Sequence, residues 1–159
     1  MMIRPIQSAD NAQMAEIIRA SLKAVGLDKP GTAYFDPSLD DLAGAYHQDT
    51  KSAYLIACDN DCILGGAGFG KITETTCELQ KLYVTEKARN KGIGRRLLEQ
   101  VICLARKADY DNMYLETTDV LAQAVNLYES LGFEQLDSPL ANDNGHHAMT
   151  IWMLKDLKK

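Results

Sequence analysis

A short glycine-containing turn joins a strand-like segment to the most regular helical pattern in the chain, and this junction constrains the fold more than any other feature. The segment 76–84 (TCELQKLYV) alternates in the manner of a β-strand. After the turn 89–94 (RNKGIG), apolar residues recur along one helical stripe: Ile93, Leu97, Leu98, Val101, Leu104, Ala105 and Ala108. The pattern predicts a strand, a tight turn and an amphipathic helix, whose N-terminus carries unpaired N–H groups and partial positive charge.

The composition of this turn favours an anion-binding site. Its two glycines let the backbone approach phosphate oxygens closely. The segment 89–96 holds four cations in a chain of net charge −5: Arg89, Lys91, Arg95 and Arg96. Each cation at a helix N-terminus interacts unfavourably with the helix dipole and destabilises the helix by ~0.3–1 kcal/mol. A bound polyanion would reverse this penalty. The alternative is a helix start whose basic side chains are simply solvated. The turn is not a nucleotide P-loop, because it does not end in Gly-Lys-Ser/Thr, and the segment 66–70 (GAGFG) lacks the dinucleotide spacing.

The remaining segments predict a single α+β domain, residues 1–159, with helices on both faces of a mixed sheet. The predicted order is β-α-α-β-β-β-α-β-α-β-β. Helices are expected from Asp10 to a stop at Gly26, from Ser38 or Asp40 to about His47, over 93–108, and over 122–131. Strands are expected over 2–6, 52–58, 62–71, 76–84, 112–117, 133–136 and 148–154.

Charge and composition disfavour several classes of protein. A net charge of −5 and a pI near 5.1 are atypical of a nucleic-acid-binding protein. No run approaches the ~20 apolar residues of a membrane span, and the first seven residues do not resemble a signal peptide, so we expect a cytoplasmic protein with reduced thiols and no membrane partner. Cys58 and Cys62 have no second ligand pair, so no metal is expected.

Two segments resemble motifs of a known family. The stretch 78–99 (ELQKLYVTEKARNKGIGRRLLE) resembles the central motif of the GCN5-related N-acetyltransferases, the GNAT superfamily, and 124–134 (AVNLYESLGFE) resembles their second motif. The loop KPGTAYFDP and the tail GHHAMTIWML resemble a bacterial, small-molecule-type branch. The resemblance implies a mostly antiparallel sheet of about seven strands flanked by four helices, and transfer of an acetyl group from acetyl-CoA to an amine.

The resemblance also implies where the cofactor binds. The turn backbone would hold the CoA pyrophosphate, through Arg89, Asn90, Lys91, Gly92, Ile93, Gly94 and Arg95. The strand before it would splay from its neighbour, and pantetheine would lie in the gap beside Leu82, Tyr83 and Val84. Ala124 and Tyr128 would complete the site. One departure stands out: many members have an asparagine three residues before the position of Ala124, where this chain has Leu121.

Three residues are candidates for proton transfer. Tyr128 is the predicted acid for the leaving thiolate, because the family places a tyrosine there and a phenol pKa of ~10 suits that task; a core tyrosine is the alternative. Glu78 is the predicted base, because the histone-acetylating branch has its glutamate at this offset; a solvent-facing carboxylate is the alternative. His147, beside His146, is a second base candidate, against a surface-loop histidine. Strand alternation predicts that Glu78 and Gln80 share a face with Leu82 and Val84.

The acceptor site is predicted on the loop 28–37. Tyr34, Phe35 and Asp36 would wall it, together with His146, because an aromatic pair with a carboxylate suits a cationic amine; a loop anchored by its aromatics is the alternative. The chain is therefore expected to acetylate a primary amine of a small molecule or amino-acid-like acceptor by direct attack in a ternary complex. A non-catalytic acyl-CoA sensor, a protein or peptide N-acetyltransferase, and a homodimer remain open.

Overall fold

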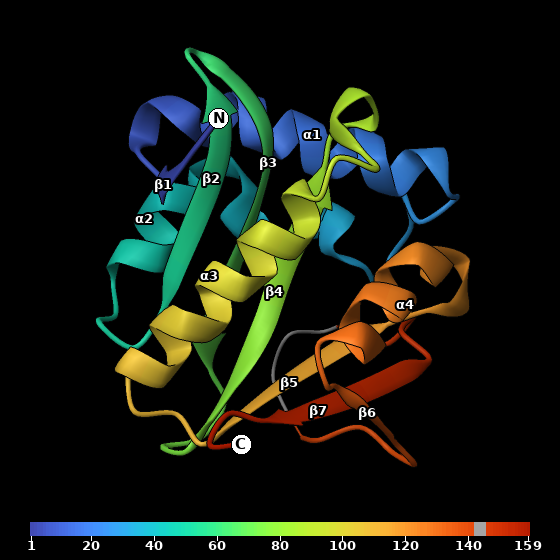
Figure 1. The fold of residues 1–159 in the computed structure, drawn as a ribbon. Coiled ribbons are helices and arrows are strands. Elements are labelled where there is room, and N and C mark those ends of the chain that lie inside the picture. The colour runs from blue at the N-terminus through green and yellow to red at the C-terminus, as the bar shows by residue number, and fades with distance from the viewer. Residues whose placement is uncertain (142–145) are drawn as a thin grey trace.

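The computed structural model describes residues 1–141 and 146–159 and arranges them around one twisted sheet (Figure 1). Within these ranges the sheet has seven strands in the order β1-β2-β3-β4-β5-β7-β6. β4 and β5 are parallel, and the other neighbouring pairs are antiparallel. The strands are β1 (Met2–Pro5), β2 (Ala53–Asp59), β3 (Cys62–Lys71), β4 (Thr76–Val84), β5 (Asn112–Thr117), β6 (Glu134–Leu136) and β7 (Ile151–Asp156).

Helices cover both faces of this sheet (Figure 1). α1 (Asn11–Ala24) and α2 (Leu42–His47) enclose the α1-side core, which includes Met14, Ile18 and Leu42. α3 (Ile93–Lys107) and α4 (Ala122–Ser130) enclose the α3-side core, which includes Leu97, Leu98 and Tyr128. The predicted order of elements, and the mixed sheet with four flanking helices, are confirmed. In the described ranges, no helix combines the length and apolarity needed to cross a membrane.

β4 contains a bulge in its middle. Opposite it on β3, Gly68 pairs with Gln80 but Gly66 pairs with Tyr83, so β4 carries one extra residue over this stretch. Lys81 lies at the bulge with a φ of 53°, in the left-handed region that non-glycine residues seldom adopt. The extra residue shifts the alternation of side chains along β4 by one position.

The shift separates side chains that simple alternation places together. Gln80 reaches the α2 side, where it contacts Tyr46, whereas Leu82 and Val84 pack against the α3-side core. Tyr83 packs against the α1-side core instead. The prediction that residues 78, 80, 82 and 84 share one face is therefore wrong, because it assumes a strand without a bulge.

β4 and β5 separate after a short paired stretch. Their pairing runs from Thr76 opposite Asn112 to Glu78 opposite Tyr114. β7 follows β5 further, as far as Thr117. In the described part of the chain, the second half of β4 therefore has a strand partner on its β3 side and none on its β5 side. An unpaired strand edge presents N–H and C=O groups that another extended chain can bind.

Two elements start two or more residues later than predicted. A 3₁₀ helix, η3 (Pro37–Asp41), precedes α2, which begins at Leu42 because the Asp41 side chain accepts a hydrogen bond of 3.0 Å from the Gly44 N–H. The last strand begins at Ile151, not at 148, because the Ala148 N–H donates to the carbonyl of Gly31 instead of joining the sheet.

Candidate active site

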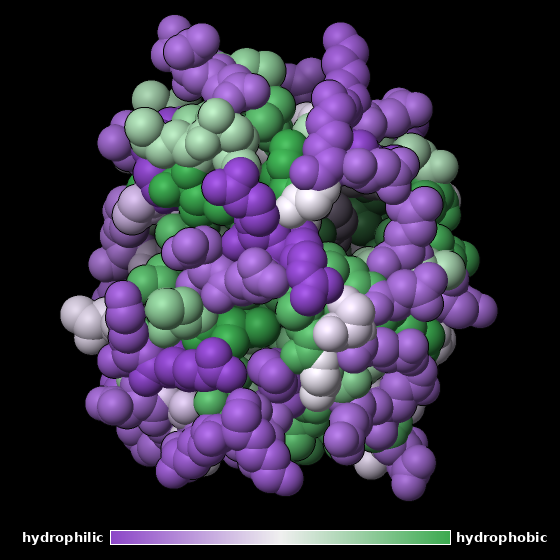
Figure 2. All heavy atoms as spheres, in the orientation of Figure 1, coloured by the Kyte–Doolittle hydropathy of each residue, from purple (hydrophilic) through white to green (hydrophobic). Residues whose placement is uncertain are grey.

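A cavity of about 800 Å³ opens where β4 and β5 separate. Its wall consists of β4 from Glu78 to Val84, most of the turn 88–95, the end of β5, α4 as far as Tyr128, the end of α1, Thr32 and Ala33, and residues 146 and 149. In Figure 2 the surface is hollowed near the N-terminal end of α3, and apolar atoms are visible inside the hollow. One cavity thus joins the predicted phosphate turn to several of the predicted catalytic residues.

The turn before α3 has the backbone geometry of an anion cradle. Asn90 and Gly92 both adopt left-handed conformations, with φ of 61° and 77°. Alternating backbone handedness turns successive N–H groups toward one point, where an anion can bind. A Cβ on Gly92 would meet no atom within 4 Å, so the side facing solvent there is open. The described residues of this turn therefore fit a pyrophosphate.

The side chains of the turn divide into two groups. The cavity wall includes Arg89, Asn90, Gly92, Ile93, Gly94 and Arg95, while Lys91 is exposed and lies outside the wall. Arg95 also bridges two helices, since its guanidinium contacts Glu99 on α3 and the hydroxyl of Ser130 on α4, each at 3.1 Å. Both partners are exposed, so Arg95 carries a charge that is paired with Glu99 at the surface.

The gap between β4 and β5 fits the pantetheine arm. Leu82, Tyr83 and Val84 form the β4 wall of the gap, and their contact with the arm stays a prediction. The facing wall is the end of β5, at Glu116 and Thr117. An extended arm with amide groups can pair with the unpaired edge of β4 much as a strand would.

Tyr128 lies on α4 where the core meets the cavity. Its ring packs edge-to-face against Phe133, with centroids 5.9 Å apart, and the side chain is buried in the α3-side core. It also lines the cavity, together with Ala124 one turn earlier. Burial raises the pKa of Tyr128, so the phenol holds its proton at neutral pH. The ring therefore packs in the core and borders the cavity, while its raised pKa makes the phenol a weaker acid toward a thiolate, and the acid role stays a prediction.

Leu121 occupies the N-cap of α4, where the resemblance leads one to expect asparagine. Its side chain makes no capping hydrogen bond. It packs against the α1-side core and lines the cavity. The position therefore supplies an apolar wall at this end of the cavity instead of a polar contact.

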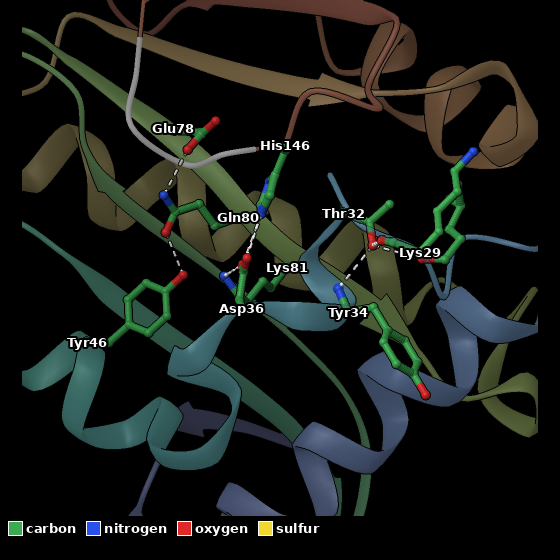
Figure 3. Close-up of polar contacts among 10 residues, drawn as sticks. Lys29, Thr32, Tyr34, Asp36, Tyr46, Glu78, Gln80, Lys81 and His146 are labelled. Atoms are coloured by element: carbon green, nitrogen blue, oxygen red, sulfur yellow. Dashed lines mark hydrogen bonds and ion pairs between the residues drawn. The ribbon is translucent and has the colours of Figure 1, made fainter.

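Glu78 is held by a chain of hydrogen bonds that crosses from α2 to β4 (Figure 3). The Tyr46 hydroxyl donates to Oε1 of Gln80 at 2.6 Å, and Nε2 of Gln80 donates to Oε1 of Glu78 at 2.9 Å. Glu78 is 5% exposed and lines the cavity. A Cβ on Gly70 would lie 3.0 Å from the Gln80 amide, so the absent side chain makes room for it.

A second polar cluster joins the acceptor loop, the bulge and the tail (Figure 3). The Asp36 carboxylate lies 3.0 Å from Nζ of Lys81 and 3.0 Å from Nε2 of His146. Burial alone would raise the pKa of Asp36, but His146 and Lys81 together lower it below its usual value. The Lys81 side chain is 9% exposed, so its ammonium depends on this carboxylate for compensation.

The predicted acceptor residues lie at different distances from the cavity. His146 lines it, but Tyr34, Phe35 and Asp36 do not; Thr32 and Ala33 form that part of the wall. Phe35 is 59% exposed, and its ring meets that of Tyr34 edge-on at 5.1 Å. Their assignment to the acceptor remains a prediction, and in this structure Asp36 acts on the wall through His146 and Lys81.

His147 is exposed and lies outside the cavity wall. Its ring covers Gly31, where a Cβ would lie within 2.5 Å of the imidazole. The adjacent Ala148 N–H donates to the Gly31 carbonyl at 3.1 Å. This contact pins the tail to the loop 28–37, and the position of His147 gives its predicted catalytic role no support.

Several residues of the site had no clear signal in the sequence. Glu116 lines the cavity and accepts a hydrogen bond of 2.7 Å from the Tyr114 hydroxyl. Its position as an acidic residue at the end of a strand is a signal from which it could have been predicted. The sequence around Gln80 and Tyr46 contains no such signal. Within the described ranges, no three His, Cys, Asp or Glu side chains cluster as metal ligands.

The turn and the splayed strands together define an enzyme that binds an acyl-CoA. The profile of the acetyltransferase (GNAT) family matches residues 13–133, and the chain belongs to that family. It is 34% identical over 160 residues to an uncharacterized N-acetyltransferase, YjgM of Escherichia coli (strain K12), covering 98% of this chain and 94% of that one. The protein is therefore an acetyl-CoA-dependent acyltransferase.

Solved structures show the same fold. A GNAT acetyltransferase of Staphylococcus aureus Mu50 superposes with a TM-score of 0.85 at 21% identity, covering 98% of both chains. The putative acetyltransferase yncA of Salmonella typhimurium, solved with acetyl-CoA, gives 0.76 at 24% identity, covering 100% of this chain and 95% of that one. Others are named an aminoglycoside 6′-N-acetyltransferase and a ribosomal-protein-alanine N-acetyltransferase, so the shared fold spans acceptors of different kinds.

Proposed function

We propose that this enzyme transfers the acetyl group of acetyl-CoA to a primary amine of a small molecule or amino-acid-like acceptor, by direct attack in a ternary complex. The observation that carries the proposal is one cavity lined both by the phosphate turn and by Glu78, Tyr128 and His146. A volume of about 800 Å³ lies within the range typical of small-molecule sites.

The first chemical step is removal of a proton from the acceptor. A lysine-like amine has a pKa of ~10.4 and is mostly protonated at neutral pH, so a base must accept one proton before the nitrogen can attack. Glu78 supplies a buried carboxylate whose orientation Gln80 fixes. His146, the histidine that lines the cavity, is the second candidate, and its ring contacts Asp36.

The second step is attack and release. The amine nitrogen attacks the thioester carbonyl carbon, and the carbonyl oxygen takes the negative charge, which a backbone N–H near Val84 would stabilise. The C–S bond then breaks, the amide forms as its nitrogen gives up a second proton, and the thiolate takes a proton from Tyr128. The proton lost by the nitrogen restores the phenol through solvent. Because burial raises the pKa of Tyr128, this hydroxyl is protonated when the thiolate leaves.

Turnover can be tested with a panel of amines. The enzyme is mixed with acetyl-CoA and single amino acids, polyamines and amino sugars, and free thiol is followed with a thiol-reactive dye. Acceptor-dependent thiol release with a matching acetylated product supports the proposal. CoA binding without release by any amine would identify a sensor, and acetylation of proteins alone would identify a protein acetyltransferase.

We also propose that the enzyme works in the cytoplasm. Its four cysteines are unpaired, and two of them, Cys62 and Cys103, are exposed. Exposed unpaired thiols persist in a reducing compartment. Fractionation of cells that express the enzyme at its native level would test this, and recovery from an oxidising compartment would contradict it.

A further inference from the structure

Three glycines at alternate positions of β3 leave one face of the strand without side chains. Gly66, Gly68 and Gly70 share the face toward the α1-side core, while Ala67 and Phe69 on the other face belong to the α3-side core. Glycine weakens the interior of a strand, and there it commonly marks the close approach of another group to the backbone. The three glycines therefore call for a group that needs this space.

The ring of Tyr54 occupies most of that space. Tyr54 lies on β2 directly opposite Gly68, and it is 2% exposed. A Cβ on either Gly66 or Gly68 would lie 2.6 Å from an atom of this ring, well inside van der Waals contact. The ring therefore crosses β3 and reaches β4, where the hydroxyl donates a hydrogen bond of 2.7 Å to the carbonyl of Lys81. Burial raises the pKa of Tyr54, so the hydroxyl keeps the proton that it donates.

The carbonyl that accepts this hydrogen bond belongs to the bulge of β4. Lys81 has a φ of 53°, a conformation that a non-glycine residue keeps only where its surroundings hold it. In a regular strand a carbonyl points toward a neighbouring strand, whereas the Lys81 carbonyl meets a side chain of the α1-side core. The carbonyl and the N–H of one planar peptide unit point in opposite directions, so the same hydrogen bond fixes the direction of the Leu82 N–H.

A second tyrosine supports the adjacent residue of β4. Tyr46, on α2, packs against Tyr54 with ring centroids 5.2 Å apart, and its hydroxyl donates to the side chain of Gln80. Gly70 makes room for that side chain, as Gly66 and Gly68 do for Tyr54. The two hydroxyls thus contact successive residues of β4, one through its side chain and the other through its main chain.

We infer that Tyr54 is a positioning residue of the active site, which acts through the bulge of β4. Tyr54 itself lies outside the cavity wall, but the residues from Lys81 to Val84 form part of that wall. The hydroxyl holds the peptide unit at which the strand changes its alternation, and so it holds the conformation of the residues that follow. Without it, Lys81 can relax toward a regular strand, and the wall loses the shape that receives the coenzyme.

Tyr54→Phe tests this role, because it keeps the ring and removes only the donor. The affinity for CoA, measured by calorimetry, should fall about three- to tenfold. The nucleotide fragment of CoA, which carries the phosphates alone, should bind the variant and the parent equally, because the turn 89–94 does not depend on Tyr54. A role confined to stability would lower the melting temperature without separating the two ligands.

Tyr110→Phe is the matched control. Tyr110 is 3% exposed, and its hydroxyl donates a hydrogen bond of 2.8 Å to the backbone carbonyl of Lys51, away from the cavity wall. Each variant loses one buried hydrogen bond from a tyrosine to a carbonyl, so both should melt lower by roughly 2–6 °C. Weaker binding of CoA is expected for Tyr54→Phe alone.

Gly66→Ala gives a second readout that keeps the hydroxyl. The new Cβ would lie 2.9 Å from the Tyr54 hydroxyl and 2.6 Å from the ring, so it should displace both and weaken CoA binding without affecting the nucleotide fragment. This variant carries the test if Tyr54→Phe does not fold. Unchanged CoA affinity, an equal loss for the nucleotide fragment, or an equal loss in Tyr110→Phe would overturn the inference. None of these measurements requires turnover, so they stand apart from the test of the acceptor.

Discussion

The amide of Gln80 donates a hydrogen bond of 2.9 Å to the carboxylate of Glu78, two residues earlier on the same strand. The Tyr46 hydroxyl fixes the amide in this orientation, because it donates to the amide oxygen and leaves the nitrogen facing the carboxylate. Gly70 provides the space in which the amide lies. Three elements of the fold thus determine how the proposed base is presented to the cavity.

Replacing Gln80 tests whether that presentation matters for catalysis. Gln80→Leu removes the donor and should lower kcat about tenfold while CoA affinity stays the same, because the amide lies on the acceptor side of the bulge. Steady-state kinetics and calorimetry give the two values. Gln100→Leu makes the same exchange at an exposed position of α3 and should change neither. An unchanged kcat in Gln80→Leu would argue against Glu78 as the base.

Tyr128→Phe should lower kcat about a hundredfold and leave CoA affinity within about twofold, because the ring still packs on Phe133 while the proton donor is lost. The deficit should shrink with an acyl donor whose thiol is more acidic, since such a thiolate leaves without a proton. Full activity in the variant would reduce Tyr128 to a packing residue.

Gly92→Asp should abolish measurable CoA binding. The substitution places a carboxylate at the phosphate turn and forces a side chain into a left-handed conformation, with φ of 77°. Gly26→Asp is the matched control, because Gly26 has φ of 76° and equally open surroundings but lies outside the cavity wall. Both variants bear the same backbone strain, so a loss of binding confined to Gly92→Asp isolates the effect of charge at the turn.

Asp36→Asn should destabilise the protein at neutral pH by about 2 kcal/mol, because the Lys81 ammonium and His146 lose their carboxylate partner. The pKa of Asp36 is lowered in the folded state, so its contribution is present above the ordinary aspartate pKa and is lost as the pH falls through the folded value. The difference between variant and parent in denaturant unfolding should therefore vanish in acid. Asp40→Asn, at an exposed position, should show little difference at any pH.

The turn and the order of elements could be predicted from the sequence because their signals are local. Gly92 and Gly94 stand next to an unbroken helical stripe, and Gly132 ends the next helix, so each element is marked by its own residues. The roles of Tyr128 and of the β4 wall came from the resemblance to the family's motifs, since helical spacing alone favours a core tyrosine. Local pattern therefore carried the fold, and local pattern with the resemblance carried the prediction of where the cofactor binds.

The acceptor half could not be predicted in the same way. Lys81 gives no sign of a left-handed conformation, since such positions favour glycine or asparagine. The contact from Tyr46 to Gln80 spans 34 residues, and the contact from His146 to Asp36 spans 110. Such contacts depend on how separate elements pack against one another in the folded chain. The pattern of residues within one segment does not predict that packing.

The bulge at Lys81 divides β4 into two parts that both line the cavity. In the function proposed above, side chains before the bulge serve the incoming amine and the strand after it serves the coenzyme. The acceptor specificity could therefore be changed by substitutions in residues 28–47 and in β4 before the bulge. The acetyl-CoA site would stay unchanged. Natural substitutions have the same freedom, since the acceptor specificity can change without any change in the residues that bind acetyl-CoA.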